Sequence, residues 1–384
     1  MSGFVREVVL VGGGHSHAIA LRLFGRYPHP KVRLTLVSDV VQTPYSGMLP
    51  GHVAGFYRVR ECHIDLPTLA AFAGAQFVRD RAVGLDLKQN CLLCESGRSI
   101  SFDVLSIDIG STPTTLDIPG GAKFAIPAKP VPQFLHHWYC LLEQVKAYPQ
   151  KPLVLGVVGG GAGGVELMLN LRAQLHRILR QAKQPRSNLQ LHLFHRGTEL
   201  MSGHASIVRQ RMQQLLVRYD VRLHLNESVS SVKPGIEISC ESGLQVNVDR
   251  LFWVTQASAP SWLAEAGLAT DRDGFVLVGE TLQSRSHPHV FAAGDIATMQ
   301  QHPRPKAGVF AVRQGQPLFE NLRRFCNDEP LHSYIPQKQI LALIGTGDGR
   351  AIASRGNWGL GPWRLLWYWK DWIDRRFMKQ FENL

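Results

Sequence analysis

Two segments of the chain share one pattern, a short run of hydrophobic residues that ends in a cluster of glycines. The first run covers residues 8–11 and leads into glycines at 12–14, and the second covers residues 154–158 and leads into glycines at 159–161. Short runs rich in valine are typical of strands buried in a parallel sheet. We interpret each segment as a strand–turn–helix unit, which predicts an α/β fold.

The second glycine cluster contains the complete G-x-G-x-x-G pattern at Gly159, Gly161 and Gly164. In this pattern the first glycine makes a tight turn, the second lets the backbone approach a pyrophosphate, and the third permits close packing of the helix on the strand. The helix N-terminus adds free N–H groups and the positive end of the helix dipole. The second cluster therefore predicts a binding site for a dinucleotide.

The first glycine cluster departs from this pattern at its third position. Gly12 and Gly14 are present, but His17 stands where the third glycine is usual, after His15 and Ser16. The ring of His17 either takes over the packing role of that glycine or turns toward a cofactor. Because both clusters predict a phosphate-binding loop, we expect the chain to bind two dinucleotides side by side, the first of them at residues 12–17.

The ends of the next strands distinguish the two dinucleotides. Residues 32–38 alternate as a strand does and are followed by Asp39, at about the spacing where a carboxylate accepts hydrogen bonds from a ribose. Residues 189–194 form the matching strand of the second unit, but His195 and Arg196 follow it in place of an acid. Arg196 would pair with a 2′-phosphate, which predicts NADPH over NADH. The alternative is an exposed turn with relaxed selectivity.

Composition indicates a globular body with a positive charge. Hydrophobic residues make up 45% of the 384 residues, and 42 basic residues against 30 acidic ones give a net charge of +12. No apolar run is long enough to span a bilayer, and the chain begins directly on its first strand, so we expect a cytoplasmic protein without a signal peptide. The charge favours an anionic membrane surface or anionic substrates, and we expect no nucleic acid as a partner because no nucleic-acid-binding fold is visible.

Further motifs resemble the two-dinucleotide flavoproteins of the pyridine nucleotide-disulfide oxidoreductase superfamily. Residues 102–110 resemble a strand that ends in Ala-Thr-Gly in that superfamily, with Asp108 in place of the alanine. Residues 248–255 resemble the equivalent strand after the NAD(P)H domain. Gly294 and Asp295 match the motif whose aspartate binds the flavin ribityl chain. The order of these motifs implies FAD and NAD(P)H as the two dinucleotides.

The resemblance also implies a domain order, in which an NAD(P)H domain is inserted into an FAD domain and both are Rossmann-like. The implied segments are the FAD domain at 1–115 and 283–330, the NAD(P)H domain at 116–282, and a C-terminal extension at 331–384. Residues 43–51, 305–315 and 369–378 resemble more closely the type II NADH dehydrogenase-like branch that is fused to, or encoded beside, selenide, water dikinase. The kinase half itself is absent from this sequence.

Roles for single residues follow from the resemblance. Glu166 would lie beside the nicotinamide and act in catalysis, the alternative being an acid that merely favours the helix N-terminus. Lys306 and Ala307 would open a helix whose dipole faces the flavin, with Lys306 as an added charge; a solvated surface lysine is the alternative. The further flavin contacts are Pro44, Val83, Gly110, Gly294 and Asp295. No metal is expected, because the His and Cys residues lack the spacing of a metal site.

Cysteine placement distinguishes classes of reaction. Cys91 and Cys94 alone have the spacing of a redox disulfide, and the sequence around them predicts a strand and a hairpin turn, without the helix N-terminus that would lower a thiol pKa. Electrons would then pass from NAD(P)H to FAD and directly to a quinone or another small acceptor, as the resemblance implies. The alternatives are a soluble reductase that supplies selenium metabolism and a flavin-binding scaffold without catalysis.

The C-terminal residues 358–381 combine aromatic and basic side chains. They predict a helix whose apolar stripe consists of Leu366, Trp369, Ile373, Phe377 and Phe381. Such a helix suits the inner face of a membrane, with peripheral attachment, or the groove of a partner such as selenide, water dikinase. The alternative is that the stripe packs on the FAD domain, with Lys370 intruding beside it.

Overall fold

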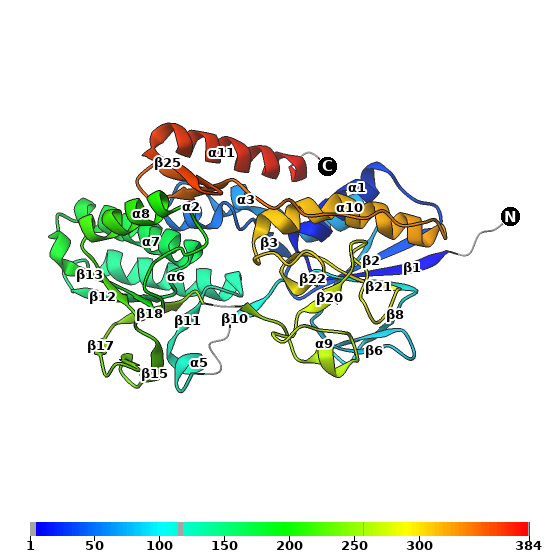
Figure 1. The fold of residues 1–384 in the computed structure, drawn as a ribbon, viewed down its shortest axis with the longest axis horizontal. Helices are drawn as coiled ribbons and strands as arrows, with labels where there is room; N and C mark the ends of the chain where they lie inside the picture. The colour runs from blue at the N-terminus through cyan, green and yellow to red at the C-terminus, as the bar shows by residue number, and fades with distance from the viewer. Residues whose placement is uncertain (1–4, 114–117, 256, 383) are drawn as a thin grey trace.

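The first glycine loop leaves the middle of a five-stranded parallel sheet with the order β21-β9-β1-β2-β5 (Figure 1). The computed structural model describes residues 5–113, 118–255, 257–382 and 384. The strands are β1 (Arg6–Val11), β2 (Val32–Ser38), β5 (Gln76–Arg79), β9 (Val104–Ile107) and β21 (Val290–Ala292). Helix α1 (His15–Arg26) follows β1 and packs along helix α10 (Gly308–Cys326), where the rings of Phe24 and Phe319 meet edge to face at 4.8 Å. The loop is thus held between a buried strand and a packed helix pair.

The second glycine loop leaves the middle of another five-stranded parallel sheet, with the order β11-β18-β12-β13-β14. Its strands are β11 (Ile126–Pro127), β12 (Leu153–Val158), β13 (Leu189–His195), β14 (Val221–Leu225) and β18 (Arg250–Trp253), and its helices are α6 (Val131–Ala147), α7 (Ala162–Gln181) and α8 (Ser206–Arg218). Helix α7 begins directly after the glycines. The prediction of an α/β fold with two Rossmann-like units is therefore confirmed.

The chain crosses between the two halves at a short antiparallel pair formed by β10 (Thr112–Pro113) and β19 (Ala257–Ser258). The structure differs here from the predicted return at residue 283. Leu263 and Phe275 already belong to the core of the first half, and β20 (Val276–Val278) pairs with β22 (Ala297–Met299). No turn or change of composition in the sequence marks where the chain returns to the first half. The residues after β19 are assigned to that half only because their side chains pack in its core.

Smaller elements complete both halves. In the first half they are β3 (Gln42–Pro44), α2 (Leu49–Val53), α3 (Val59–Cys62), β4 (His63–Asp65), α4 (Leu66–Phe72), β6 (Ala82–Asp86), β7 (Cys91–Cys94), β8 (Ser99–Ser101), α9 (Trp262–Glu265) and η3 (Gly294–Ile296). In the second half they are α5 (Gly121–Phe124), η2 (Arg186–Asn188), β15 (Val229–Lys233), β16 (Glu237–Cys240) and β17 (Gln245–Asn247). Strands β6, β7 and β8 form an antiparallel sheet, so the predicted hairpin around the two cysteines is confirmed.

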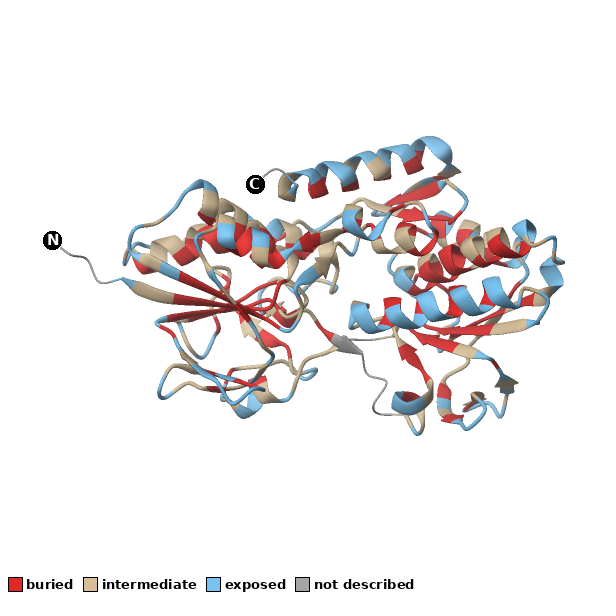
Figure 2. Ribbon diagram, turned by 180° about the vertical axis from the view of Figure 1, so that it is seen from behind, coloured by how far each residue is buried: buried red, intermediate tan, exposed pale blue. Residues whose placement is uncertain are grey.

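The C-terminal residues form an antiparallel sheet and a helix that lies across both halves (Figure 1). The elements are β23 (Ala342–Gly345), β24 (Ala351–Arg355), β25 (Trp358–Trp363), α11 (Arg364–Met378) and η4 (Lys379–Phe381). Figure 2 shows one buried and one exposed face of α11. The buried face consists of Leu366, Trp367, Lys370, Asp374, Phe377 and Met378. The predicted apolar stripe of this helix is thus partly wrong. Trp369, which was placed in the stripe, is 43% exposed, whereas Lys370 is buried and pairs with Asp374 one turn later.

Candidate active site

The first glycine loop needs glycine at its turn and leaves N–H groups free. Gly12 has a φ of +93°, and a Cβ there would lie 2.4 Å from the Asp108 carbonyl oxygen. The Gly12 N–H donates to the Val37 carbonyl at 2.8 Å. Among the described residues, the N–H groups of Gly13 and His15 have no acceptor. A phosphate at this turn would supply those acceptors, so the loop fits a dinucleotide.

His17 takes the packing role of the missing glycine. Its ring is fully buried and joins the turn to the neighbouring strand, with Nδ1 2.7 Å from the Gly12 carbonyl oxygen and Nε2 2.8 Å from Ser106 Oγ. Burial lowers the pKa of the imidazole to about 4, so the ring is neutral near pH 7. These contacts support the packing role of the His17 ring, and a contact of His17 with a cofactor stays a prediction.

Asp108 places a buried carboxylate at the N-terminus of helix α1. Its Oδ2 accepts the N–H of Ser16 at 2.8 Å and that of His17 at 3.1 Å. Burial raises the pKa of this carboxyl to about 7. The sequence marked Asp108 only as a departure from Ala-Thr-Gly, because its contacts with α1 exist only after β9 and β1 have paired.

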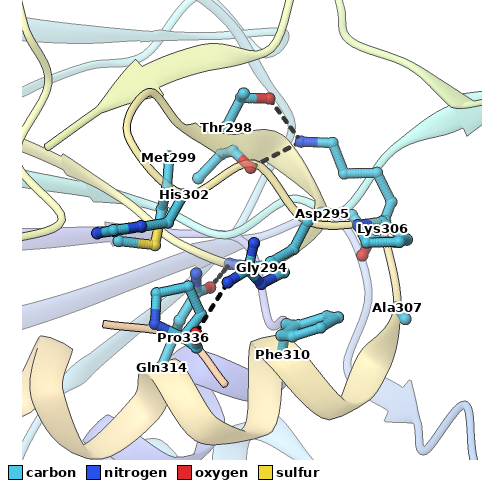
Figure 3. A pocket seen from close by; sticks show the side chains of 13 residues that line it. Gly294, Asp295, Thr298, Met299, His302, Lys306, Ala307, Phe310, Gln314 and Pro336 are labelled. Carbon is cyan, nitrogen blue, oxygen red and sulfur yellow. Dashed lines mark hydrogen bonds between the residues drawn. The ribbon is translucent and has the colours of Figure 1, made fainter. Parts of the chain in front are cut away.

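A pocket opens at the N-terminus of helix α10, where Gly294, Asp295 and Ala307 lie together (Figure 3). The Asp295 carboxylate accepts a hydrogen bond from Lys129 Nζ at 2.7 Å and one from Ser111 Oγ at 3.4 Å. Asp295 is thus oriented by a lysine of the second half, which lies between β11 and α6. Nothing in the sequence pointed to Lys129, which lies in a proline-containing linker.

Lys306 lines the same pocket, but its ammonium group is already satisfied by the protein. It donates to the Ala297 carbonyl at 2.7 Å and to Thr298 Oγ1 at 2.8 Å (Figure 3). The ammonium nitrogen also lies 3.9 Å from the centroid of the Phe275 ring. Burial lowers its pKa to about 8. A solvated surface lysine is therefore excluded, and a flavin contact of this side chain stays a prediction.

The other residues expected around the FAD lie in the first half, in or shortly after β2, β3, β6 and β9. Asp39 follows β2 and pairs with Arg81 at 3.2 Å. Val83 is the second residue of β6 and is 42% exposed. Pro44 ends β3, and Gly110 follows β9 with a φ of +72° and no heavy atom within 4 Å of a Cβ built there. Their contacts with a cofactor stay predictions.

The second glycine loop offers an open anion site. Among the described residues, no acceptor binds the N–H groups of Gly161–Gly164, at the start of α7. A Cβ on Gly161 would meet nothing within 4 Å, whereas a Cβ on Gly164 would lie 1.9 Å from the Gly159 carbonyl oxygen. Gly164 is therefore needed for packing, and Gly161 borders free space. Both features fit a dinucleotide pyrophosphate.

His195 and Arg196 lie where the second ribose is expected. His195 Nδ1 accepts the Gly160 N–H at 3.3 Å, and its Nε2 donates to the Glu199 carbonyl at 3.1 Å, so the ring covers the glycine turn. Arg196 is exposed and has no ion-pair partner within the described part of the chain. Its guanidinium is available to a 2′-phosphate, and the preference for NADPH stays a prediction.

Helix α11 contributes a buried ion pair to the junction of the halves. Lys370 Nζ lies 2.7 Å from the Asp374 carboxylate and donates to the Gly47 carbonyl at 2.5 Å. Burial and the neighbouring Asp374 carboxylate raise the pKa of the Tyr45 hydroxyl, and the Tyr45 ring lies 5.5 Å from that of His15 in the first glycine loop. Sequence analysis missed this pair, because a lysine beside an apolar stripe is normally solvated.

Glu166 reaches the same place from helix α7. Its Oε1 accepts the Gly345 N–H at 2.7 Å. Burial raises the pKa of the Glu166 carboxyl to about 7; the Lys370 ammonium opposes the rise, and Asp374 adds to it. An acid that titrates near neutrality therefore lies with a lysine between the two glycine loops, an arrangement suited to proton transfer. We call Glu166, Lys370, Asp374 and Tyr45 the junction cluster.

The two cysteines with redox-like spacing cannot act as a local pair. Cys91 and Cys94 lie three residues apart on the central strand of the β6–β7–β8 sheet, and successive side chains of a strand alternate between its faces. Burial raises the pKa of the Cys94 thiol, which disfavours its thiolate.

Within the described residues no group of three or more His, Cys, Asp or Glu side chains is placed to hold a metal ion.

Known proteins are similar to this chain in sequence and in fold. The family model of the pyridine nucleotide-disulphide oxidoreductases matches residues 6–315. The chain belongs to this family. It is 21% identical over 379 residues to the NADH dehydrogenase-like protein YutJ of Bacillus subtilis. The aligned region covers 95% of this chain and 99% of that protein. The prediction of an oxidoreductase that uses FAD and NAD(P)H is thereby confirmed.

Two solved structures have the same fold over nearly the whole chain. The sulfide:quinone oxidoreductase of Aquifex aeolicus superposes with a TM-score of 0.81 at 19% identity, over 99% of this chain and 92% of that one. NDH2 of Plasmodium falciparum, in complex with NADH, superposes with a TM-score of 0.76 at 14% identity, over 98% and 97%. The superpositions include the C-terminal extension, which the family model leaves out.

Proposed function

We propose that this oxidoreductase passes electrons from NAD(P)H through FAD directly to a quinone, without a disulfide. The junction cluster is the observation that carries the proposal. It joins helix α7 of the second glycine loop to Tyr45, whose ring contacts His15 of the first loop. A quinone needs protons as well as electrons, and the cluster is a buried acid–base group between the two dinucleotide sites.

The balance of the reaction defines what the protein must provide. NAD(P)H, one proton and a quinone give NAD(P)⁺ and a quinol. Bound FAD would supply the electron-transfer step between donor and acceptor. The hydride brings two electrons and one proton equivalent, so one further proton must enter from solvent. Glu166 in its acid form can donate that proton, and Lys370, held by Asp374, stabilises the carboxylate that remains.

The glycine loops and the pocket at helix α10 supply the positioning that hydride transfer needs. The free N–H groups of Gly161–Gly164 would hold the donor pyrophosphate, and those of Gly13 and His15 would hold the FAD pyrophosphate. Asp295, oriented by Lys129, would bind the ribityl chain. No nucleophile is required, because catalysis of hydride transfer consists of orientation in a dry pocket.

Direct transfer makes a prediction about the cysteines. A variant with Cys91→Ser and Cys94→Ser should keep quinone turnover within about twofold of wild type, whereas loss of an obligatory dithiol would lower kcat by orders of magnitude. The measurement is anaerobic bleaching of the flavin by NADH or NADPH, followed by reoxidation with a soluble quinone. Collapse of reoxidation in the folded, flavin-loaded variant would contradict direct transfer. An FAD-loaded wild type that neither donor bleaches would instead identify a non-catalytic scaffold.

A lipid quinone would require contact with a membrane, and the outer face of α11 and β25 suits one. Leu365, Tyr368 and Trp372 are 74%, 64% and 56% exposed, and the Arg376 guanidinium lies 5.2 Å from the centroid of the Trp372 ring. Aromatic and basic side chains together favour an anionic interface. None of the described helices is long and apolar enough to cross a bilayer. From the exposed aromatic and basic side chains of α11 we propose peripheral attachment at the cytoplasmic face.

Sedimentation with vesicles tests this attachment. Leu365→Glu together with Trp372→Glu should weaken binding to anionic vesicles about tenfold or more, because each buried apolar side chain contributes roughly 1.5–3 kcal/mol. Tyr148→Glu is the matched control, since Tyr148 is 53% exposed on the second half. Equal binding of all three proteins would contradict the proposed face. A role in selenium metabolism, or docking of selenide, water dikinase on α11, stays a prediction of the resemblance alone.

A further inference from the structure

Asp108 occupies a position that a bound FAD would also use. Its carboxylate accepts the N–H groups of Ser16 and His17 at 2.8 and 3.1 Å, in the first turn of the helix that should hold the FAD pyrophosphate. A Cβ on Gly14 or on Gly294 would lie 2.2 or 2.3 Å from the carboxyl group. The side chain is 2% exposed and is enclosed on both sides by backbone. A protein anion and a cofactor anion are thus directed to the same helix N-terminus.

The second strand–turn–helix unit provides an internal comparison. A Cβ on Gly12 would lie 2.4 Å from the Asp108 carbonyl oxygen. In the second unit, a Cβ on Gly159 would lie 2.5 Å from the Val254 carbonyl oxygen. Val254 is therefore the structural counterpart of Asp108, and its side chain is uncharged. In that unit the N–H groups of the helix start have no acceptor among the described residues. Of the two strand–turn–helix units, only the first therefore has a buried acid at the start of its helix.

We propose that FAD binding requires Asp108 in its carboxylic acid form, so that the protein takes up one proton with the cofactor at alkaline pH. The inference rests on the proposed FAD site. A carboxylate beside a doubly charged pyrophosphate would repel it, whereas a carboxylic acid removes that charge and offers a donor to a phosphate oxygen. Burial, together with the charge of the nearby Asp295, raises the pKa of Asp108 to about 7 against the hydrogen bonds from His17 and Ser16, and a neighbouring phosphate would shift it further in the same direction.

Several other titratable groups face this position, and they act differently. His15 and His17 on α1 have pKa values lowered by burial to about 4, so both stay neutral above pH 6. Asp295 is held by Lys129. Lys306 faces Asp295 from the start of α10, and its pKa, lowered by burial to about 8, places its titration in the same range. Any loss of FAD affinity that comes from Lys306 would persist when Asp108 is replaced.

The experiment measures FAD release from the holoprotein, as recovery of free FAD fluorescence, between pH 6 and pH 9. Well above the pKa a single linked proton weakens binding about tenfold for each pH unit, so wild-type affinity should fall about 50-fold from pH 7, where half of the carboxyl is ionised, to pH 9. Asp108→Asn should remove this dependence and bind FAD more tightly than wild type at pH 9. Asp103→Asn is the matched control, since Asp103 also accepts a backbone N–H, from Glu7 at 2.7 Å, but lies outside the loop.

A second variant and a spectroscopic measurement make the test independent of the behaviour of Asp108→Asn alone. Asp108→Val copies the residue of the second unit and should give the same flat profile. Infrared spectra of wild-type holoprotein at pH 8 should contain the carbonyl band of a protonated carboxyl group, which Asp108→Asn removes. A wild-type affinity that does not change with pH, or a slope in both variants as steep as that of the wild type, would overturn the inference. Absence of FAD binding in every protein at every pH would instead contradict the FAD site itself.

Discussion

Replacing Gly161 by valine should abolish the use of NAD(P)H and leave the rest of the protein intact. Gly161 has a φ of −71° and a ψ of 173°, which valine adopts readily, and no protein atom lies within 4 Å of a Cβ built there. The added side chain would fill the space that the pyrophosphate needs. Loss of two hydrogen bonds from backbone N–H groups to a charged phosphate costs about 3 kcal/mol, so kcat/KM for the donor should fall about 100-fold or more.

Stopped-flow reduction of the flavin by NADH and by NADPH measures this effect, with FAD content and melting temperature as checks of the fold. Gly203→Val is the matched control. Gly203 is exposed in a turn of the same half, and a Cβ there would also meet nothing within 4 Å. Normal donor kinetics in Gly161→Val would mean that the second glycine loop does not bind the nicotinamide dinucleotide.

The features that sequence analysis predicted correctly depend on neighbours in the chain. The glycine loops follow from runs and spacings within ten to twenty residues, and their strands and helices formed where expected, at β1 and α1 and at β12 and α7. The hairpin around Cys91 and Cys94 follows from turn residues that lie between two strands. Local rules were sufficient in these places because backbone geometry alone defines a phosphate loop.

The features that it missed depend on contacts between distant segments. Lys129 meets Asp295 across 166 positions, and Lys370 meets Gly47 across 323. The prediction treated Lys370 as an intrusion, since a lone lysine is costly to bury, but Asp374 and a carbonyl oxygen compensate it. The return of the chain at residue 257 was missed for the same reason. Only the assembled core shows which half a segment joins.

Glu166→Gln should separate the two halves of the proposed reaction. Reduction of the flavin by NAD(P)H requires no proton from the protein, so its rate should stay within about twofold of wild type. Reduction of a quinone does require one, and loss of a general acid typically costs 10²–10⁴ in rate, so quinone turnover should fall about 100-fold. Glutamine keeps an amide oxygen that can accept the Gly345 N–H, which preserves the position of the side chain.

The pH dependence of turnover identifies the acid. Because burial raises the pKa of Glu166 to about 7, its acid form is present below pH 7 and is lost as the pH rises, so wild-type kcat with a soluble quinone should decline from pH 6 to pH 9. In Glu166→Gln the rate should be low at every pH and should not show that decline. Glu143→Gln, which removes an exposed acid paired with Lys146, should retain the wild-type profile. A Glu166→Gln protein with wild-type turnover and an unchanged profile would remove Glu166 from the proton path and leave the junction cluster a structural role.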